Sequence, residues 1–159
     1  MKKIFPFLLL IAILGAGCSS AQNPPGNQPA TTHAQNGTTL DLHGRGLTTI
    51  PTDVFSRTEL VTLDLSNNGL TGAPQSQIGQ LKNLQTLDLS NNSLTGLPAE
   101  LGQLSKLEVL DVSNNKLTGL PMELGNLTQL RVLNVSGNPY SKQDLDGIAT
   151  KLANTKIIR

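Results

Sequence analysis

The sequence predicts an α/β-type repeat solenoid with short parallel strands on its concave face. Pairs of aliphatic residues separated by one residue recur at intervals of 23, 24, 23 and 23 residues, and the first members are Leu40, Leu63, Leu87, Leu110 and Leu133. An asparagine follows at a fixed distance in the last four repeats. The chain has no Trp, one Tyr and three Phe, so its core is built from Leu, Ile and Val, which favours a repetitive architecture.

Residues 1–17 have the composition of a secretion signal. Lys2 and Lys3 give a positively charged start, and residues 4–14 form an apolar stretch interrupted only by Pro6. This stretch is too short to span a bilayer, for which a helix needs about 20 residues. We expect the segment to be removed on export.

The signal ends in Leu14-Gly15-Ala16-Gly17-Cys18, which resembles the bacterial lipobox, although Gly15 stands where that motif usually has Leu. The resemblance implies that the Cys18 thiol is acylated and that the chain is cut in front of it. The product would be a protein of the bacterial cell envelope, lipid-anchored to a membrane and exposed to the periplasm or the cell exterior. The alternative is an ordinary secretory signal followed by an incidental free cysteine.

Residues 18–37 are expected to be the acylated cysteine and a disordered tether. After Cys18 the segment is polar, rich in Pro, Gly, Asn and Gln, and without any aliphatic residue larger than Ala. Such a composition cannot bury enough apolar surface to offset the entropy lost on ordering. The tether would hold the folded part close to the membrane but off its surface.

Residues 38–138 contain about 4.5 repeats, in which each Leu-x-Leu predicts a short strand with both leucines pointing inward. In three repeats the residues spell L-x-x-L-x-L-x-x-N-x-L, with the last leucine at Leu70, Leu94 and Leu117. This pattern resembles the leucine-rich repeat family, and the lipobox makes the chain similar to its short bacterial lipoproteins. The resemblance implies a solenoid whose coils bury one another's leucines, and it implies protein binding more often than glycan binding.

Asparagines and prolines mark the turns of the coils. The asparagines that follow the strands are Asn68, Asn92, Asn115 and Asn138. We interpret them as structural, because an amide can donate to and accept from backbone groups that leave the sheet. The prolines on the return side are Pro51, Pro74, Pro98 and Pro121. They predict an irregular or extended convex side without long helices.

Both ends of the stack need closing segments, because an open end exposes leucines and strand edges. The first repeat has Arg45 in the asparagine position and is interpreted as a cap. Residues 139–159 are predicted to form a C-terminal cap with a helix, begun by Ser141 and Asp144 as an N-cap pair, and a closing strand over Lys156–Ile158. The apolar face that predicts the helix consists of Leu145, Ile148, Ala149 and Leu152.

Parallel strands in one register bring equivalent residues about 4.8 Å apart across the concave face. We predict that a partner binds there, on the outward residues Asp41, Asp64, Ser66, Asp88, Ser90, Asp111, Ser113 and Asn134. A row of carboxylates suits a basic protein segment or a cation. The alternative is that Asp-Leu-Ser is only the common filling of this repeat type.

One set of residues on this face resembles a catalytic arrangement, since His43 and Ser66 are expected to be neighbours and Asp41 lies close to His43. The set would lie on a smooth surface without a pocket or an oxyanion hole, so we do not expect an enzyme. The sequence also has no phosphate-binding loop and no motif for a metal or a cofactor.

These observations predict a membrane-anchored, monomeric module for protein–protein interaction at the bacterial envelope. The alternative is a structural or adhesive envelope protein that binds glycan or host surface material. Nucleic acid is not an expected partner, because without Lys2 and Lys3 the chain has 10 basic and 11 acidic residues. Nucleic-acid binding normally needs an excess of clustered basic side chains.

Overall fold

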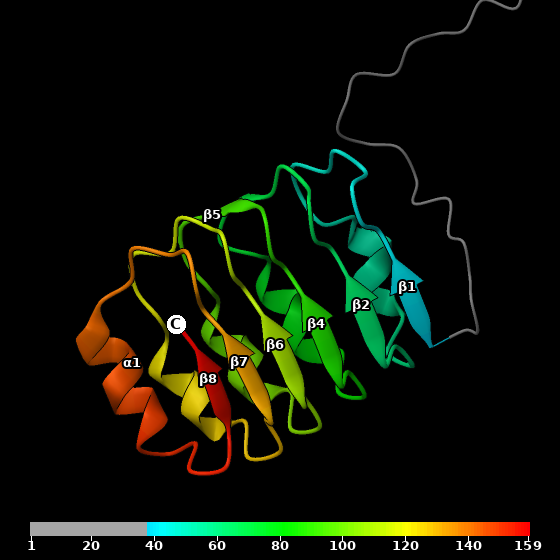
Figure 1. Cartoon of the computed structure of the whole chain (residues 1–159). Coiled ribbons are helices and arrows are strands. Elements are labelled where there is room, and N and C mark those ends of the chain that lie inside the picture. The colour runs from blue at the N-terminus through cyan, green and yellow to red at the C-terminus, as the bar shows by residue number, and fades with distance from the viewer. Residues whose placement is uncertain (1–37) are drawn as a thin grey trace, which may run out of the picture.

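The computed structural model describes residues 38–159, which form a curved stack of coils with one helix at its C-terminal end (Figure 1). Six short strands make one parallel sheet in the order β1-β2-β4-β6-β7-β8. Their bounds are Thr39–Asp41 (β1), Thr62–Asp64 (β2), Thr86–Asp88 (β4), Val109–Asp111 (β6), Val132–Asn134 (β7) and Lys156–Ile158 (β8). The predicted solenoid is confirmed. The predicted signal, Cys18 and the tether lie outside the described residues.

The interior of the stack consists of leucines from successive coils that lie side by side. Leu63, Leu87 and Leu110 occupy the same register position on neighbouring strands, and none of them is exposed. Since alternate residues of a strand point to opposite faces, the residues on either side of each leucine point outward. Burial of each leucine contributes about 1.5–3 kcal/mol. Contacts between neighbouring coils therefore supply most of the stability.

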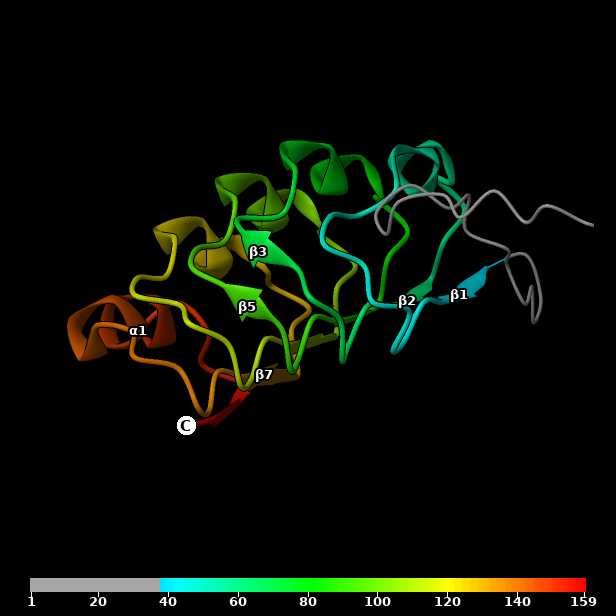
Figure 2. The same ribbon diagram turned by 90° about the horizontal axis from the view of Figure 1, so that it is seen from above.

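The convex side carries a row of 3-10 helices, each five residues long (Figure 2). Their bounds are Thr52–Ser56 (η1), Ser76–Gln80 (η2), Ala99–Gln103 (η3) and Met122–Asn126 (η4). The absence of long helices from this side is as predicted, and the short helices refine the expected irregular backbone. Pro51, Pro98 and Pro121 precede their helices as N-cap residues, where no N–H is required. The second coil has one extra residue, and its N-cap is Gln75.

A second, smaller sheet lies on the flank of the stack, where the chain has left the main sheet (Figure 2). It pairs β3 (Thr71–Gly72) with β5 (Ser93–Leu94) in parallel. The repeat pattern does not predict these strands, because two residues are too few to show alternation. The flank therefore has its own backbone ladder, separate from that of the concave face.

The C-terminal cap consists of α1 (Lys142–Ala149) and the last strand of the main sheet, β8. Leu145 and Ile148 of the helix are buried against the core, and Ile157 of β8 pairs with Leu133 in the leucine register. The predicted capping helix and closing strand are confirmed. No helix within residues 38–159 is long and apolar enough to cross a membrane.

The start of this helix differs from the prediction. Ser141 is the N-cap residue, but its side chain makes no capping hydrogen bond. Asp144 Oδ2 instead accepts a hydrogen bond of 3.2 Å from the backbone N–H of Leu120. Gly119, beside it, has no side chain, which leaves room for the carboxylate. The predicted Ser141–Asp144 cap pair is therefore wrong, and Asp144 ties the helix to the fourth coil.

Candidate binding surface

The candidate site is the concave face of the main sheet, whose strands lie side by side in Figure 1. The pairing register defines a central column of outward residues: Asp41, Asp64, Asp88, Asp111, Asn134 and Ile158. A second column beside it is Thr39, Thr62, Thr86, Val109, Val132 and Lys156. The repeat pattern alone ends both columns one strand earlier, because β8 belongs to the cap.

The acidic residues of the central column also have a structural role that the sequence did not reveal. Asp64 Oδ1 accepts hydrogen bonds from the backbone N–H and the hydroxyl of Ser66, at 2.8 and 2.6 Å. Asp111 repeats this turn, which holds the chain as it leaves the strand. Asn134 makes the same two bonds to Ser136, at 3.2 and 2.8 Å. The turn therefore needs a side-chain oxygen and not a negative charge.

The second carboxylate oxygen distinguishes the aspartates from one another. Asp111 Oδ2 accepts a hydrogen bond of 2.8 Å from the side-chain amide of Asn134. Within residues 38–159, the hydrogen bonds of Asp64 and Asp88 use Oδ1 alone. No group of three or more His, Cys, Asp and Glu side chains in this part of the chain could hold a metal ion. One carboxylate on each strand suits an extended basic segment better than a single cation.

The serines of the expected contact surface are more enclosed than the aspartates. Ser66, Ser90 and Ser113 are 4, 7 and 5 % exposed. Their backbone N–H groups all donate to the aspartate two residues earlier. This differs from the expectation that the serines contact a partner, because the turn draws them against the sheet. The residues of the concave face that remain accessible to a partner are therefore those of the central column and the second column.

The four asparagines after the strands connect each coil to the one before it. Asn92 is representative: its Nδ2 donates to the carbonyls of Leu89 and Ser90 in its own coil and of Leu65 in the preceding coil, at 3.0–3.1 Å. Its Oδ1 accepts from the N–H of Leu70 at 3.0 Å. The same set of bonds recurs at Asn68, Asn115 and Asn138. These side chains are committed to the backbone and support the concave face from its edge.

The residue before each asparagine, and before Arg45 in the first coil, has a backbone conformation that the repeat pattern did not predict. Asn67, Asn91 and Asn114 have φ of 53–55°, and Gly44 and Gly137 take the same place at 63° and 69°. Only glycine and asparagine adopt this left-handed region easily. The Asn-Asn pairs in the sequence could have indicated this conformation. The first asparagine of each pair has the positive φ, and the side chain of the second one bonds to the backbone.

The residues of the catalytic-like set meet only in part. His43 Nδ1 lies 2.9 Å from Ser66 Oγ. However, Asp41 accepts from the backbone N–H of His43 at 2.9 Å and not from its ring. The Ser66 hydroxyl donates to Asp64 at 2.6 Å. A serine nucleophile must give its proton to an imidazole that a carboxylate orients, and this geometry provides neither bond.

Comparison with known protein families identifies a matching family. The model of the leucine-rich repeat region matches residues 58–159, which include the three regular coils and the C-terminal cap. A search of curated proteins finds no match.

Solved structures of repeat proteins share the fold. A leucine-rich repeat protein of Leptospira interrogans is 42% identical, with a TM-score of 0.67, over 71% of this chain and 29% of that one. The BIR3–SERK2 complex from Arabidopsis thaliana gives 40% identity and a TM-score of 0.59, over 64% of this chain and 56% of that one. The plant peptide hormone receptor RGFR1, in complex with RGF2, gives 36% identity and a TM-score of 0.64, over 76% and 20%. The chain therefore spans only a fraction of the length of these proteins.

Proposed function

The chain belongs to the leucine-rich repeat family, and from this premise we propose that it is a lipid-anchored module of the bacterial envelope whose concave face binds a protein partner. The observation that carries the proposal is the uninterrupted register of six parallel strands, which lines up two columns of outward side chains. An extended or curved partner can contact every coil of such a surface at once. Many weak contacts then add to a useful affinity.

The charge of the central column suggests the chemistry of the partner. Asp64 and Asp88 lie on adjacent strands and each keeps one carboxylate oxygen free of hydrogen bonds within residues 38–159. Like charges about 4.8 Å apart repel each other and favour the approach of a cationic group. A segment that carries Lys or Arg would therefore be preferred over an acidic or purely apolar one.

The neighbouring structures support a protein or peptide as the partner class. One matched chain belongs to a complex between BIR3 and SERK2, and the other structure is described as the peptide hormone receptor RGFR1 in complex with RGF2. Both are built on the fold that this chain has. We transfer only the class of partner to this chain and neither of these particular partners.

The anchor follows from the segment before the described residues. Cys18 ends a stretch that resembles a lipobox, and acylation there would attach the chain to a membrane of the cell envelope. Each buried methylene contributes about 0.8 kcal/mol, so the two or three acyl chains of a mature lipoprotein make attachment durable. The concave face would then be presented close to the membrane, in the periplasm or at the cell exterior.

The proposal is tested by comparing two triple variants of equal charge in co-purification from envelope extracts. In the concave variant, Asp64, Asp88 and Asp111 are changed to Asn. In the convex control, Asp53→Asn, Glu100→Gln and Glu123→Gln remove three charges from the row of 3-10 helices. We expect the concave variant to lose the partner that the unmodified chain and the convex control retain. Equal capture by all three proteins would contradict a concave site.

A glycan array with the same three proteins tests the adhesive alternative. Binding of an envelope or host glycan by the unmodified chain, without any protein captured, would replace the protein partner with a carbohydrate.

A further inference from the structure

On the flank, the backbone ladder between the first and second coils stops early. The N–H of Gly69 donates to the carbonyl of Leu47 at 2.8 Å, and within residues 38–159 no backbone hydrogen bond joins the two coils between this point and their 3-10 helices. One coil further on, the ladder continues, because Ser93 N–H donates to Leu70 and Thr95 N–H donates to Gly72, both at 2.8 Å. The flank is therefore open at one junction and closed at the next.

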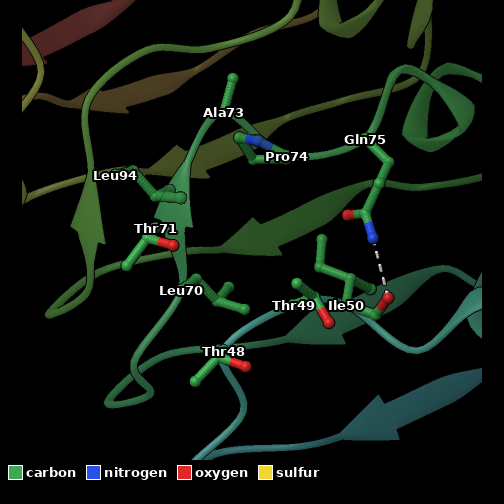
Figure 3. Close-up of a pocket in the computed structure, with 9 residues that line it drawn as sticks. All are labelled: Thr48, Thr49, Ile50, Leu70, Thr71, Ala73, Pro74, Gln75 and Leu94. Atoms are coloured by element: carbon green, nitrogen blue, oxygen red, sulfur yellow. Dashed lines mark hydrogen bonds between the residues drawn. The ribbon is translucent and has the colours of Figure 1, made fainter. Parts of the chain in front are cut away.

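A pocket of about 150 Å³ occupies this open junction (Figure 3). We call it the flank pocket, and it is lined by Thr48, Thr49, Ile50, Leu70, Thr71, Ala73, Pro74, Gln75 and Leu94. The side-chain amide of Gln75 reaches across to the carbonyl of Ile50 at 3.0 Å and closes one end. Ile50, Leu70 and Leu94 are buried and give an apolar floor, while the threonines are exposed at the rim.

The pocket lies where the second coil has a proline in place of the larger aliphatic side chain of the other coils. The residue before the N-cap of the 3-10 helix is Ile50, Leu97 or Leu120 in the other coils, and each of these is at most 9 % exposed. In the second coil, whose N-cap is Gln75, it is Pro74, which is buried, and the exposed Ala73 precedes it. Gly72 before it has φ of 68°, and the Ala73 methyl group points away from Ile50 and Gln75 in Figure 3. Neither the size nor the direction of this side chain fills the junction.

The rim of the pocket offers unpaired backbone groups. β3 pairs with β5 along one edge, and its other edge faces the first coil. Within residues 38–159, the N–H and C=O groups of Thr71 make no backbone hydrogen bond on this side, nor do those of Thr48 and Thr49 across the gap. All three residues are exposed. A free strand edge of this kind pairs readily with an extended peptide.

We propose that the flank pocket binds an extended peptide segment of a second protein, with one Leu, Ile or Val side chain in the pocket and adjacent peptide groups bonded to the edge at Thr71. A pocket of about 150 Å³ with an apolar floor has room for one branched aliphatic side chain and not for a whole acyl chain. The unpaired rim favours a peptide over a hydrocarbon, because a hydrocarbon would leave these polar groups without partners. This site is separate from the concave face and does not depend on it.

The test uses the full chain in phospholipid nanodiscs and capped pentapeptides, with empty nanodiscs as the blank. Saturation-transfer NMR measures the affinity of Thr-Thr-Leu-Thr-Thr, of the same peptide with a central Ala, and of the Leu peptide with its central amide N-methylated. We expect the Leu peptide to bind, the Ala peptide to bind at least about tenfold more weakly, and the N-methylated peptide to be weakened as well. No binding of the Leu peptide, or equal affinity for the Leu and Ala peptides, overturns the proposal.

Two rim variants locate the site. Thr48→Phe and Thr49→Phe add bulk at the mouth of the pocket, and we expect each to reduce affinity for the Leu peptide at least about tenfold. The matched controls are Thr95→Phe and Thr118→Phe, which change exposed residues of the third and fourth coils outside the pocket. A thermal melt establishes that all four variants are folded. Unchanged affinity in both rim variants overturns the proposal.

A third protein separates this site from the concave one. The triple change of Asp64, Asp88 and Asp111 to Asn is expected to leave affinity for the Leu peptide unchanged. Loss of binding in that variant would assign the peptide to the concave face and overturn the flank site. Failure of the flank site, in turn, leaves the concave comparison intact.

Discussion

The junction between the first and second coils differs from the junctions that follow it. In the later coils a glycine lies four residues after the N-cap residue of the 3-10 helix, and a Cβ added to Gly79 would come within 2.8 Å of Glu100 Cβ. In the first coil the same position is Phe55, which is 4 % exposed. Accordingly, η1 contacts η2 less extensively than η2 contacts η3. A buried aromatic ring thus spaces two coils that would otherwise touch.

This difference shows that the two sides of a coil can vary independently. We call the junction between the first and second coils the wide junction. On the concave side the strand register is the same there as at the next junction, since Leu40 pairs with Leu63 just as Leu63 pairs with Leu87. On the convex side Phe55 fills the extra space, and on the flank the space remains open as a pocket. The regular junctions build the scaffold, and the irregular junction creates a feature that the repeat does not have.

The largest expected effect comes from removing the spacer. Phe55→Ala should lower the free energy of unfolding by about 3–5 kcal/mol. The substitution leaves a cavity between the two coils, and the pairing of their strands in the main sheet keeps the coils from closing it. Urea denaturation followed by circular dichroism measures the change. A loss below about 1 kcal/mol would mean that the first coil closes onto the second, and the two kinds of junction would then be interchangeable.

Loss of a ladder asparagine should cost somewhat less and should depend on the junction. Asn92→Ala leaves the N–H of Leu70 in the preceding coil without its partner and removes one of the two side-chain amides that donate to the carbonyl of Leu65. We expect a loss of about 2–4 kcal/mol. Asn68→Ala at the wide junction should cost less, because Asn68 is only half-buried and water can replace its bonds. Urea denaturation of the two variants measures the difference. Equal losses in the free energy of unfolding would show that the wide junction excludes water as well as the other junctions do.

A glycine substitution probes the regular junctions alone. Gly102→Ala places a methyl group against the backbone carbonyl of Glu123, and we expect it to destabilise the protein by about 1–3 kcal/mol. Gly96→Ala is the matched control, because its Cβ would meet Ala73 Cβ at an ordinary 3.9 Å and its φ is not positive. Thermal melts of both variants report the difference. Similar melting temperatures would show that the regular coils are not in close contact.

The smallest expected effect on stability comes from substitutions on the concave face, which is the same at both kinds of junction. Changing Asp64, Asp88 and Asp111 together to Asn should alter stability by less than about 1 kcal/mol, because Asn134 already makes the same turn with a neutral side chain. Changing the same three residues to Ala removes the accepting oxygen and should destabilise the protein measurably more. If the Asn variant were as unstable as the Ala variant, the negative charge itself would be structural.

The sequence predicted the parts of the fold that repeat. Period-two alternation around Leu63 and Leu87 identified the strands and their register, and the helical spacing of Leu145 and Ile148 identified the cap. The 3-10 helices escaped prediction because five residues with i to i+3 bonding show no periodicity. Asp144 was misassigned because its actual partner, the N–H of Leu120, lies in another coil.

The candidate site was predictable in outline only. The outward columns follow from the register, whereas the Asp64–Ser66 turn depends on side-chain rotation that the pattern does not encode. The flank pocket had two visible signals, Phe55 in a glycine position and the extra residue of the second coil, which puts Pro74 in a leucine position. Its shape also depends on the positive φ of Gly72, which a single sequence does not reveal.

Photocrosslinking in intact cell envelopes tests the binding role of the concave face most directly. Thr62 and Thr86 on the concave strands, and Met122 on the convex side, are each replaced in turn by benzoylphenylalanine in the full chain. We expect discrete protein adducts from the two concave positions and none from Met122. Adducts from Met122 alone, or no adduct from either concave position, would contradict a partner-binding concave face.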